Sequence, residues 1–244
     1  MARIKQILLM LIAVVMVGCG EVPEGVTKPK YNKANETEQS KSDWLETLLP
    51  LANKGDADAQ NKLGVKYNWG NGVTQNDSQA IKWYLKAAEQ GHTEAQYNLG
   101  WMFDRGSKNT PKDLDEALKW YHKAAEGGYV KAQNRLGATY SGFLRIGFPK
   151  DFEKSVKWFR KAAEQGNTEA QFNLAGMYDD GEGVEEDDVV AYAWFKIASA
   201  NGIALSKKYK GRIAEEMTSA QIAQAEALTK EMIRKNPKLL KKKE

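Results

Sequence analysis

The residue types that most often carry out catalysis are few in this sequence, and they do not form a known catalytic pattern. The 244-residue chain has two histidines, His92 and His122, and neither has a second histidine at a spacing that would hold a metal ion. No Ser-x-x-Lys or Gly-x-Ser-x-Gly motif of a serine acyl-enzyme is present, and no glycine-rich phosphate-binding loop. We therefore expect no catalytic residue, no metal ion and no cofactor, and we interpret both histidines as surface residues.

The densest group of acidic residues lies in one short stretch of the last third of the chain. Carboxylates in such a group can bind a cation, but these lack the spacing of a calcium-binding loop. We interpret them as acidic residues of a loop and of the helix start that follows it. The seven residues are Asp179, Asp180, Glu182, Glu185, Glu186, Asp187 and Asp188.

Cys19 is the only cysteine, so the chain forms no intramolecular disulfide. Arg3 and Lys5 precede an uncharged run over residues 7–18, which is shorter than the ~20 residues that a spanning helix needs. A short basic start followed by an apolar run of this length is typical of an export signal. The sequence Val-Met-Val-Gly-Cys at residues 15–19 resembles the lipobox of bacterial lipoproteins, in which the cysteine is lipidated.

The lipobox resemblance implies cleavage after Gly18, a diacylglycerol group on the Cys19 sulfur and an acyl chain on the new amine. Three chains exceed the two signals that stable membrane anchoring needs. Gly20 follows the cysteine where an inner-membrane retention signal would have Asp, so we expect the outer membrane, facing the periplasm. Residues 19–42 are polar and are interpreted as a tether after a 1–18 signal peptide. The alternatives are an ordinary cleaved signal with a coincidental cysteine, or a cytoplasmic protein with an apolar start.

A sequence pattern occurs four times over residues 55–201. Its copies open at glycines 36, 37 and 38 residues apart, and a further glycine follows 36 residues after the last of them. Each copy continues with Ala-Gln, a leucine and an aromatic residue at steps of four, which predicts one face of a first helix. Its second half has an aromatic pair followed by a small pair, which predicts an amphipathic second helix. The opening glycines are Gly55, Gly91, Gly128 and Gly166, then Gly202.

Asn or Asp stands at each expected start of a second helix, where its side chain can cap the helix. These residues are Asn76, Asp113, Asp151 and Asp187. Glycine stands inside three of the four first helices, at Gly64, Gly100 and Gly137, although it costs about 1 kcal/mol against alanine there. We expect a close approach of a neighbouring helix to offset that cost. A period of this length indicates a stack of helix pairs.

The array resembles the Sel-1-like repeat family, a branch of the tetratricopeptide superfamily. The resemblance rests on strings such as "AQYNLGWMF", "DEALKWYHKAAEGG" and "AQFNLAGMYDDGEGV" and covers residues 55–201. It implies an all-α fold, a right-handed α-solenoid of four helix-pair repeats whose first helices line the concave face. We expect helical caps at 43–54 and 202–236, the latter with a Thr218–Gln221 capping box, and a solvated basic tail at 237–244.

Three positions of the first helix, six, ten and thirteen residues after each opening glycine, vary between copies and share one face. Tyr97, Trp101 and Phe172 occupy such positions without a packing role in the pattern, so we expect them on the concave face as partner-binding aromatics. Packing of these rings on adjacent repeats or on the caps is the alternative. Asp104 shares this face, and Arg105, Arg135 and Trp69 are expected neighbours.

The net charge of +4 is concentrated at the ends, since residues 230–244 contain seven Lys or Arg and two Glu. This is not the broad basic surface of a nucleic-acid-binding protein. We expect a non-catalytic, monomeric scaffold that binds a protein or peptide in its groove. An alternative from the family is an immunity protein that neutralises a type VI secretion phospholipase effector. A β-lactam or cell-wall hydrolase is disfavoured, because family members assigned such activity have paired cysteines in each repeat.

Overall fold

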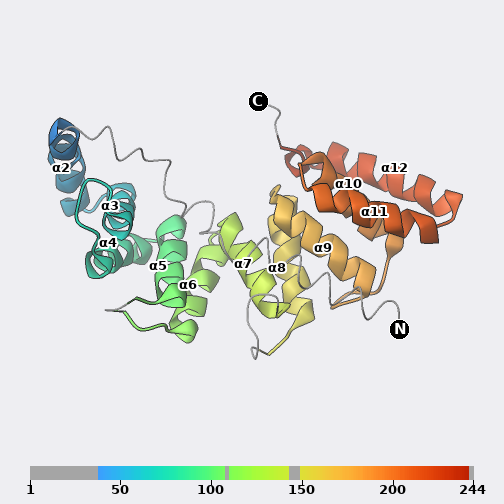
Figure 1. The fold of residues 1–244 in the computed structure, drawn as a ribbon, viewed down its shortest axis with the longest axis horizontal. Coiled ribbons are helices and arrows are strands. Elements are labelled where there is room, and N and C mark those ends of the chain that lie inside the picture. Colours follow the sequence, from blue (N-terminus) through green and yellow to red (C-terminus); the bar gives the residue numbers. More distant parts are fainter. Residues whose placement is uncertain (1–37, 108–109, 143–148, 242–244) are drawn as a thin grey trace. The chain divides into compact units, whose positions relative to one another are not determined.

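The computed structural model describes residues 38–107, 110–142 and 149–241. In this part of the chain the backbone forms α-helices, one 3-10 helix and an isolated bridge between Ser107 and Thr110, and no strand (Figure 1). The predicted all-α fold is confirmed. Cys19, the expected signal peptide and residues 20–37 lie outside the described residues. None of the described helices is both long and apolar enough to cross a membrane.

The chain divides into two compact units, residues 1–132 and 133–244, with the division inside one helix. The first unit contains α2 (Glu38–Asn53), α3 (Ala57–Trp69), α4 (Asp77–Glu89), α5 (Thr93–Arg105), α6 (Leu114–Glu126) and the start of α7 (Val130–Tyr140). The second contains the rest of α7, α8 (Phe152–Glu164), α9 (Thr168–Asp180), α10 (Asp188–Ala200), α11 (Ala204–Glu216), α12 (Ser219–Lys235) and the 3-10 helix η2 (Pro237–Leu239).

The helices pair as the repeat predicts, α3 with α4 and α5 with α6 in the first unit, and α9 with α10 in the second. The aromatic pairs of the second helices provide the core, because the Trp of each pair is buried and the Tyr or Phe beside it is fully buried. The fully buried rings are Tyr84, Tyr121, Phe159 and Phe195. Each first helix is therefore held by the aromatic and small residues of the second helix that follows it.

The predicted starts of the second helices are confirmed. The side chains of Asn76, Asp113, Asp151 and Asp187 each accept a hydrogen bond from the backbone N–H three residues later. This bond satisfies one of the donors that a helix start leaves unpaired. In the first copy, α3 ends at a left-handed glycine, Gly70, with φ +68°. In the fourth copy, α9 ends in the same way at Gly181, with φ +67°.

The glycines inside the first helices contact aromatic rings, as expected. A methyl group added to Gly64 would lie 2.4 Å from the Tyr84 ring, and one on Gly137 would lie 2.5 Å from the Phe159 ring. Gly100 approaches Tyr121 in the same way, with a distance of 2.9 Å. The cost of glycine in these helices is therefore offset by the ring that occupies the space of the missing side chain.

Both expected helical caps are present, with changed limits. At the start, α2 begins at Glu38 rather than at residue 43, and its Ala52 packs in one cluster with Ala59, Leu63 and Trp83. At the end, α11 occupies the first-helix position of a fifth copy, and α12 packs on α10. The predicted capping box forms, since Thr218 and Gln221 each bond the other's backbone.

Candidate interaction surface

The expected exposure of two partner-binding aromatics is wrong. Tyr97 is 2% exposed, and its ring lies 5.5 Å from that of Tyr121 and 5.2 Å from that of Tyr129. Phe172 is 6% exposed, with its ring 5.5 Å from that of Phe195. The alternative of packing on adjacent repeats and on a cap therefore holds for both, because each ring is enclosed by its own copy and by the next first helix.

Trp101 is buried as well, 8% exposed, so its expected exposure is also wrong; it differs from the other two rings in packing against an exposed arginine. Its ring centroid is 5.7 Å from that of Trp69, and the Arg105 guanidinium carbon lies 4.5 Å from it. Arg105 also donates to the Asp77 carboxylate, at 3.2 Å between Nη2 and Oδ2. We refer to Trp69, Trp101, Arg105 and Asp77 as the Trp–Arg cluster.

Three helices of the first unit build the Trp–Arg cluster. Trp69 ends α3, Asp77 opens α4, and Trp101 and Arg105 lie one turn apart at the end of α5. Arg105 keeps a third of its side chain exposed, and Trp69 is half-buried. The cluster therefore offers a cation stacked on aromatic surface, an arrangement that contributes both charge and apolar area to recognition.

The other predicted site residues have different positions. Asp104 is buried and accepts a hydrogen bond of 3.4 Å from the Tyr121 hydroxyl, so it supports the core beside the cluster. Arg135 lies in α7 within the second unit and is half-buried. Of the predicted partner-binding residues, the structure thus brings Trp101 and Arg105 together, and Trp69, expected as their neighbour, joins them.

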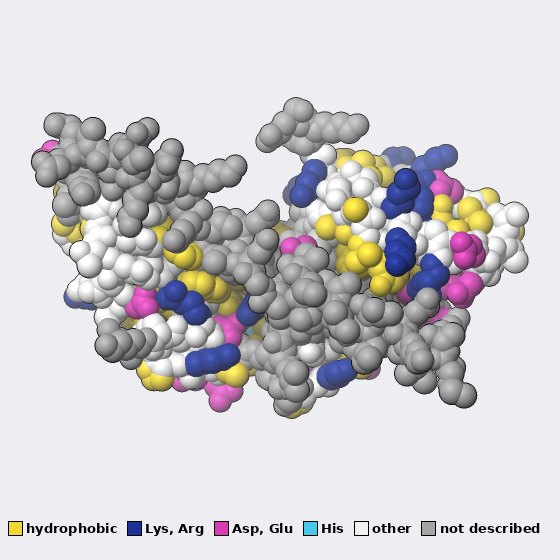
Figure 2. All heavy atoms as spheres, in the orientation of Figure 1, with side chains coloured by type: hydrophobic (Ala, Val, Ile, Leu, Met, Phe, Trp, Pro, Cys, Tyr) yellow, Lys and Arg dark blue, Asp and Glu magenta, His cyan; other side chains and the backbone are white. Residues whose placement is uncertain are grey.

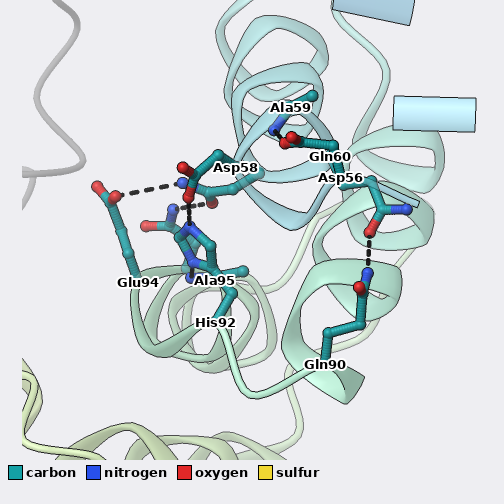
Figure 3. Close-up of polar contacts among 10 residues, drawn as sticks. Asp56, Asp58, Ala59, Gln60, Gln90, His92, Glu94 and Ala95 are labelled. Carbon is teal, nitrogen blue, oxygen red and sulfur yellow. Dashed lines mark hydrogen bonds and ion pairs between the residues drawn. The ribbon is translucent and has the colours of Figure 1, made fainter. Parts of the chain in front are cut away.

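A polar network joins α3 and α5 beside the cluster (Figure 3). The Asn98 amide donates to the Asn61 carbonyl oxygen at 3.1 Å, and the Asn61 amide donates to the Glu94 carboxylate at 3.2 Å. These bonds fix the relative positions of the first helices of copies one and two. Asn61 stands six residues after Gly55, one of the positions that vary between copies, and it is buried.

His92 is a structural residue that the sequence did not reveal. Its Nδ1 accepts the backbone N–H of Ala95, 3.1 Å away, and so caps α5. Because Nδ1 accepts this bond, the neutral ring has its proton on Nε2, which donates to the Asp58 carboxylate at 2.9 Å (Figure 3). The available signal was its position, since Asp56 and Asn167 cap α3 and α9 there.

The constant glutamine after each alanine also has a role that sequence reasoning missed. Gln60, Gln96 and Gln171 each donate to a carbonyl at the end of the preceding helix, that of Ala52, Ala88 and Ala163 respectively. Gln60 and Gln133 in turn accept a bond of 2.7 Å from Gln90 and Gln165 at the end of the next helix. The repeated Ala-Gln was the signal, because a buried amide at a constant position must be satisfied.

The acidic stretch of the fourth copy contains one carboxylate with a strongly shifted pKa. Burial raises the pKa of Asp179 to about 6, although the Arg212 guanidinium, which donates to it, acts in the opposite direction. Burial also raises the pKa of Glu182, while Lys150 lowers it. The search of the described residues finds no group of three acidic, histidine or cysteine side chains placed to hold a metal ion.

Comparisons with known proteins identify the repeat. The Sel1 repeat family matches residues 57–92, 93–129, 130–167 and 168–203. The chain belongs to the Sel1 repeat family. Sel1 repeats generally mediate protein interactions. A comparison with curated proteins gave no match.

Solved structures of other Sel1 proteins resemble this chain. A Sel1 repeat protein from Oxalobacter formigenes has 31% identity and a TM-score of 0.62, covering 71% of this chain and 74% of its own. A protective antigen of uropathogenic Escherichia coli with an SLR fold has 30% identity and a TM-score of 0.49. That match covers 86% of this chain but 53% of the antigen, so the chain spans about half the antigen's length. A Pseudomonas aeruginosa immunity protein has 20% identity and a TM-score of 0.45, covering 94% of this chain and 82% of its own.

Proposed function

We propose that this Sel1 repeat protein is a lipid-anchored scaffold of the bacterial periplasm that binds a protein or peptide partner through the Trp–Arg cluster. The observation that carries the proposal is that buried Trp101 packs against both Trp69 and Arg105, which stay accessible on two first helices. Tryptophan and arginine are the residue types that most often dominate binding energy at interfaces. Since the chain has no catalytic motif, the scaffold acts by binding alone.

The cluster is suited to recognition because it is held in place before binding. The ion pair with Asp77 and the stacking on Trp101 limit the conformations of the Arg105 side chain. A side chain that is already ordered loses less entropy on association. The network of Asn61, Asn98 and Glu94 fixes the two helices that supply the tryptophans, so the aromatic surface is rigid as well.

A matched pair of variants tests this binding surface. Arg105 and Lys123 each hold a cation over a tryptophan ring, at 4.5 Å from Trp101 and 4.1 Å from Trp120, but on a first and a second helix respectively. A photoreactive residue at position 69 would identify the partner in intact cells. Arg105→Ala should then weaken its binding at least tenfold, whereas Lys123→Ala should change it less than twofold. Equal affinities for the two variants would refute the proposed surface.

The anchor rests on Cys19 and the apolar segment before it. Lipid on the thiol would hold the array at the outer membrane, facing the periplasm. Cys19→Ser should abolish labelling with a fatty-acid analogue and move the protein from the membrane to the soluble fraction. A serine variant that still fractionates with membranes would contradict the anchor while leaving the partner-binding proposal untouched.

A further inference from the structure

The end of the chain is docked on the second unit, although a solvated tail was expected from residue 237. Asn236 donates from its amide to the Glu164 carbonyl at the end of α8, at 2.7 Å. The Leu239 carbonyl accepts from the amides of Gln171, at 2.9 Å, and Asn201, at 2.7 Å. The Leu239 side chain is 2% exposed. Residues 236–241, which we call the terminal segment, thus lie across the ends of α8 and α10.

Asn201 binds the backbone of the terminal segment at two points. Its amide nitrogen donates to the Leu239 carbonyl, and its amide oxygen accepts the N–H of Lys241 at 2.9 Å. One side chain reaches groups two residues apart because Leu240 between them is extended, with φ −105° and ψ 135°. These bonds involve backbone groups only and do not depend on residue type, so selectivity at this site comes from the buried leucine.

The equivalent residues of other copies show why a segment binds here. Gln90 and Gln165 precede their glycines as Asn201 precedes Gly202. Each donates both to the glutamine in the first helix of its own copy and to a carbonyl of its own helix. The shorter Asn201 keeps the first bond, to Gln171 at 2.8 Å, but gives the second to Leu239. One methylene fewer therefore redirects a donor from the helix to the terminal segment.

The opening glycines lead to the same conclusion. A methyl group added to Gly166 would lie 2.4 Å from the Lys238 carbonyl oxygen, so the terminal segment passes directly over this glycine. At Gly55, Gly91, Gly128 and Gly202 an added methyl group would have no described atom within 4 Å. Of these five related positions, the segment covers Gly166, which opens the copy that contains Gln171 and Asn201.

We propose that Gly166, Gln171 and Asn201 form a peptide-binding site for a basic segment with one buried leucine, and that residues 236–241 occupy it within the same chain. The preference for a basic segment follows from the two helix ends beneath it, since the carbonyl end of a helix attracts cations. Lys238 precedes the buried Leu239, and Lys241 lies two residues after it. Figure 2 shows further Lys and Arg side chains over α10–α12. This site is independent of the Trp–Arg cluster.

A peptide-exchange experiment on the full chain tests the site. The probe is a fluorescent peptide with the sequence of residues 236–244, followed by anisotropy. Leu239→Asp in the protein would bury a charge and should displace the chain's own segment from the site. This variant should therefore bind the probe at least tenfold more tightly than the wild type does. Adding Asn201→Ala should abolish that binding, while adding Gln90→Ala, at the equivalent position of the first unit, should leave it within twofold.

A probe with Leu239→Ser, which has the same net charge, should not bind, and this separates leucine recognition from charge attraction. Probe binding that is equal for wild type and Leu239→Asp, or that survives Asn201→Ala, would overturn the proposal. So would the absence of binding to a Leu239→Asp protein with normal helicity.

Hydrogen exchange gives a second test that needs no change in the terminal segment. The Lys241 N–H is bonded to Asn201, so Asn201→Ala should speed its exchange at least tenfold. Gln90→Ala should leave that rate unchanged. An unchanged Lys241 rate in Asn201→Ala would overturn the proposal even if the Leu239→Asp protein does not fold.

Discussion

At the scale of single residues, glycines at the same position of the repeat have different surroundings in different copies. Gly64 lies against a tyrosine ring, whereas Gly211, at the same position of α11, would have no described atom within 4 Å of an added methyl group. α12 presents no ring there, because it packs on α10. The following helix therefore crowds this position at Gly64 and leaves it open at Gly211.

Alanine substitutions at these two glycines should have opposite effects on stability. Gly64→Ala gains helix propensity but forces the Tyr84 ring to move, so it should destabilise the protein by about 1–3 kcal/mol. Gly211→Ala gains the propensity without a clash and should stabilise it by about 0.5–1 kcal/mol. Urea unfolding followed by circular dichroism measures both, and a destabilising Gly211→Ala would contradict the assignment.

Asp179 should make stability depend on pH. Its pKa in the folded protein, about 6, is above the ordinary value of 3.8, so the folded state binds the proton more tightly than the unfolded state does. Its favourable contribution is therefore present below about pH 4 and is lost as the pH rises through 6. Relative to Asp179→Asn, the wild type should gain stability in urea when the pH is lowered from 7 to 4. If the difference in unfolding free energy between wild type and Asp179→Asn is the same at pH 7 and pH 4, the Asp179 carboxylate is not desolvated.

At the scale of helices, most of the described α-helices begin with a side-chain cap, although α11 has none. The caps of the second helices were predicted, because Asn and Asp are common at that position. The cap of α5 was not, because histidine rarely has this role and needs one particular tautomer. Local sequence therefore predicts the boundaries of these helices wherever the capping residue is of a common type.

Substitutions of His92 separate its role as a helix cap from its hydrogen bond with Asp58. His92→Ala removes both the bond to Ala95 and the contact with Asp58, and should cost about 1 kcal/mol. His92→Asn restores the kind of cap that Asn167 provides and should recover most of that loss. Thermal or urea unfolding distinguishes the two variants, and equal losses would mean that the Asp58 contact, rather than the cap, stabilises α5.

At the scale of the whole molecule, the chain is a series of copies, and within each unit successive helix pairs contact each other. Such proteins have a stability that is approximately the sum of local terms. The core of the first unit is built around Tyr84 and Tyr121, and that of the second around Phe159 and Phe195. A change in one unit should therefore leave local stability in the other largely intact.

Hydrogen exchange with Gly64→Ala tests this independence. The substitution should accelerate exchange in α3, α4 and α5, which contact one another, and leave α9–α11 within about twofold of the wild type. Gly137→Ala, which meets Phe159, should have the reverse pattern. Uniform acceleration along the chain in either variant would indicate a single cooperative unit instead.

The repeats, the close approach of a helix at the internal glycines and most helix caps could be predicted from the sequence, because these features depend on residues within one copy. The exposure of Tyr97 and Phe172 could not be predicted, since Tyr129 and Tyr209 of the following first helices enclose them. The docked Leu239 was missed for the same reason, because the leucine pair of the basic tail forms no periodic pattern. Contacts between distant segments were the part that spacing alone did not reveal.

The constant glutamine has an evolutionary consequence. Its amide bonds a main-chain carbonyl of the preceding helix, and such a joint does not depend on the side chains of the copy before it. Gene duplication can therefore insert or remove a whole copy and still produce a satisfied junction. The fourth copy keeps this joint through Gln171, and the same amide also bonds the Leu239 carbonyl of the terminal segment. A junction of this kind therefore accepts either another copy or a short docked segment.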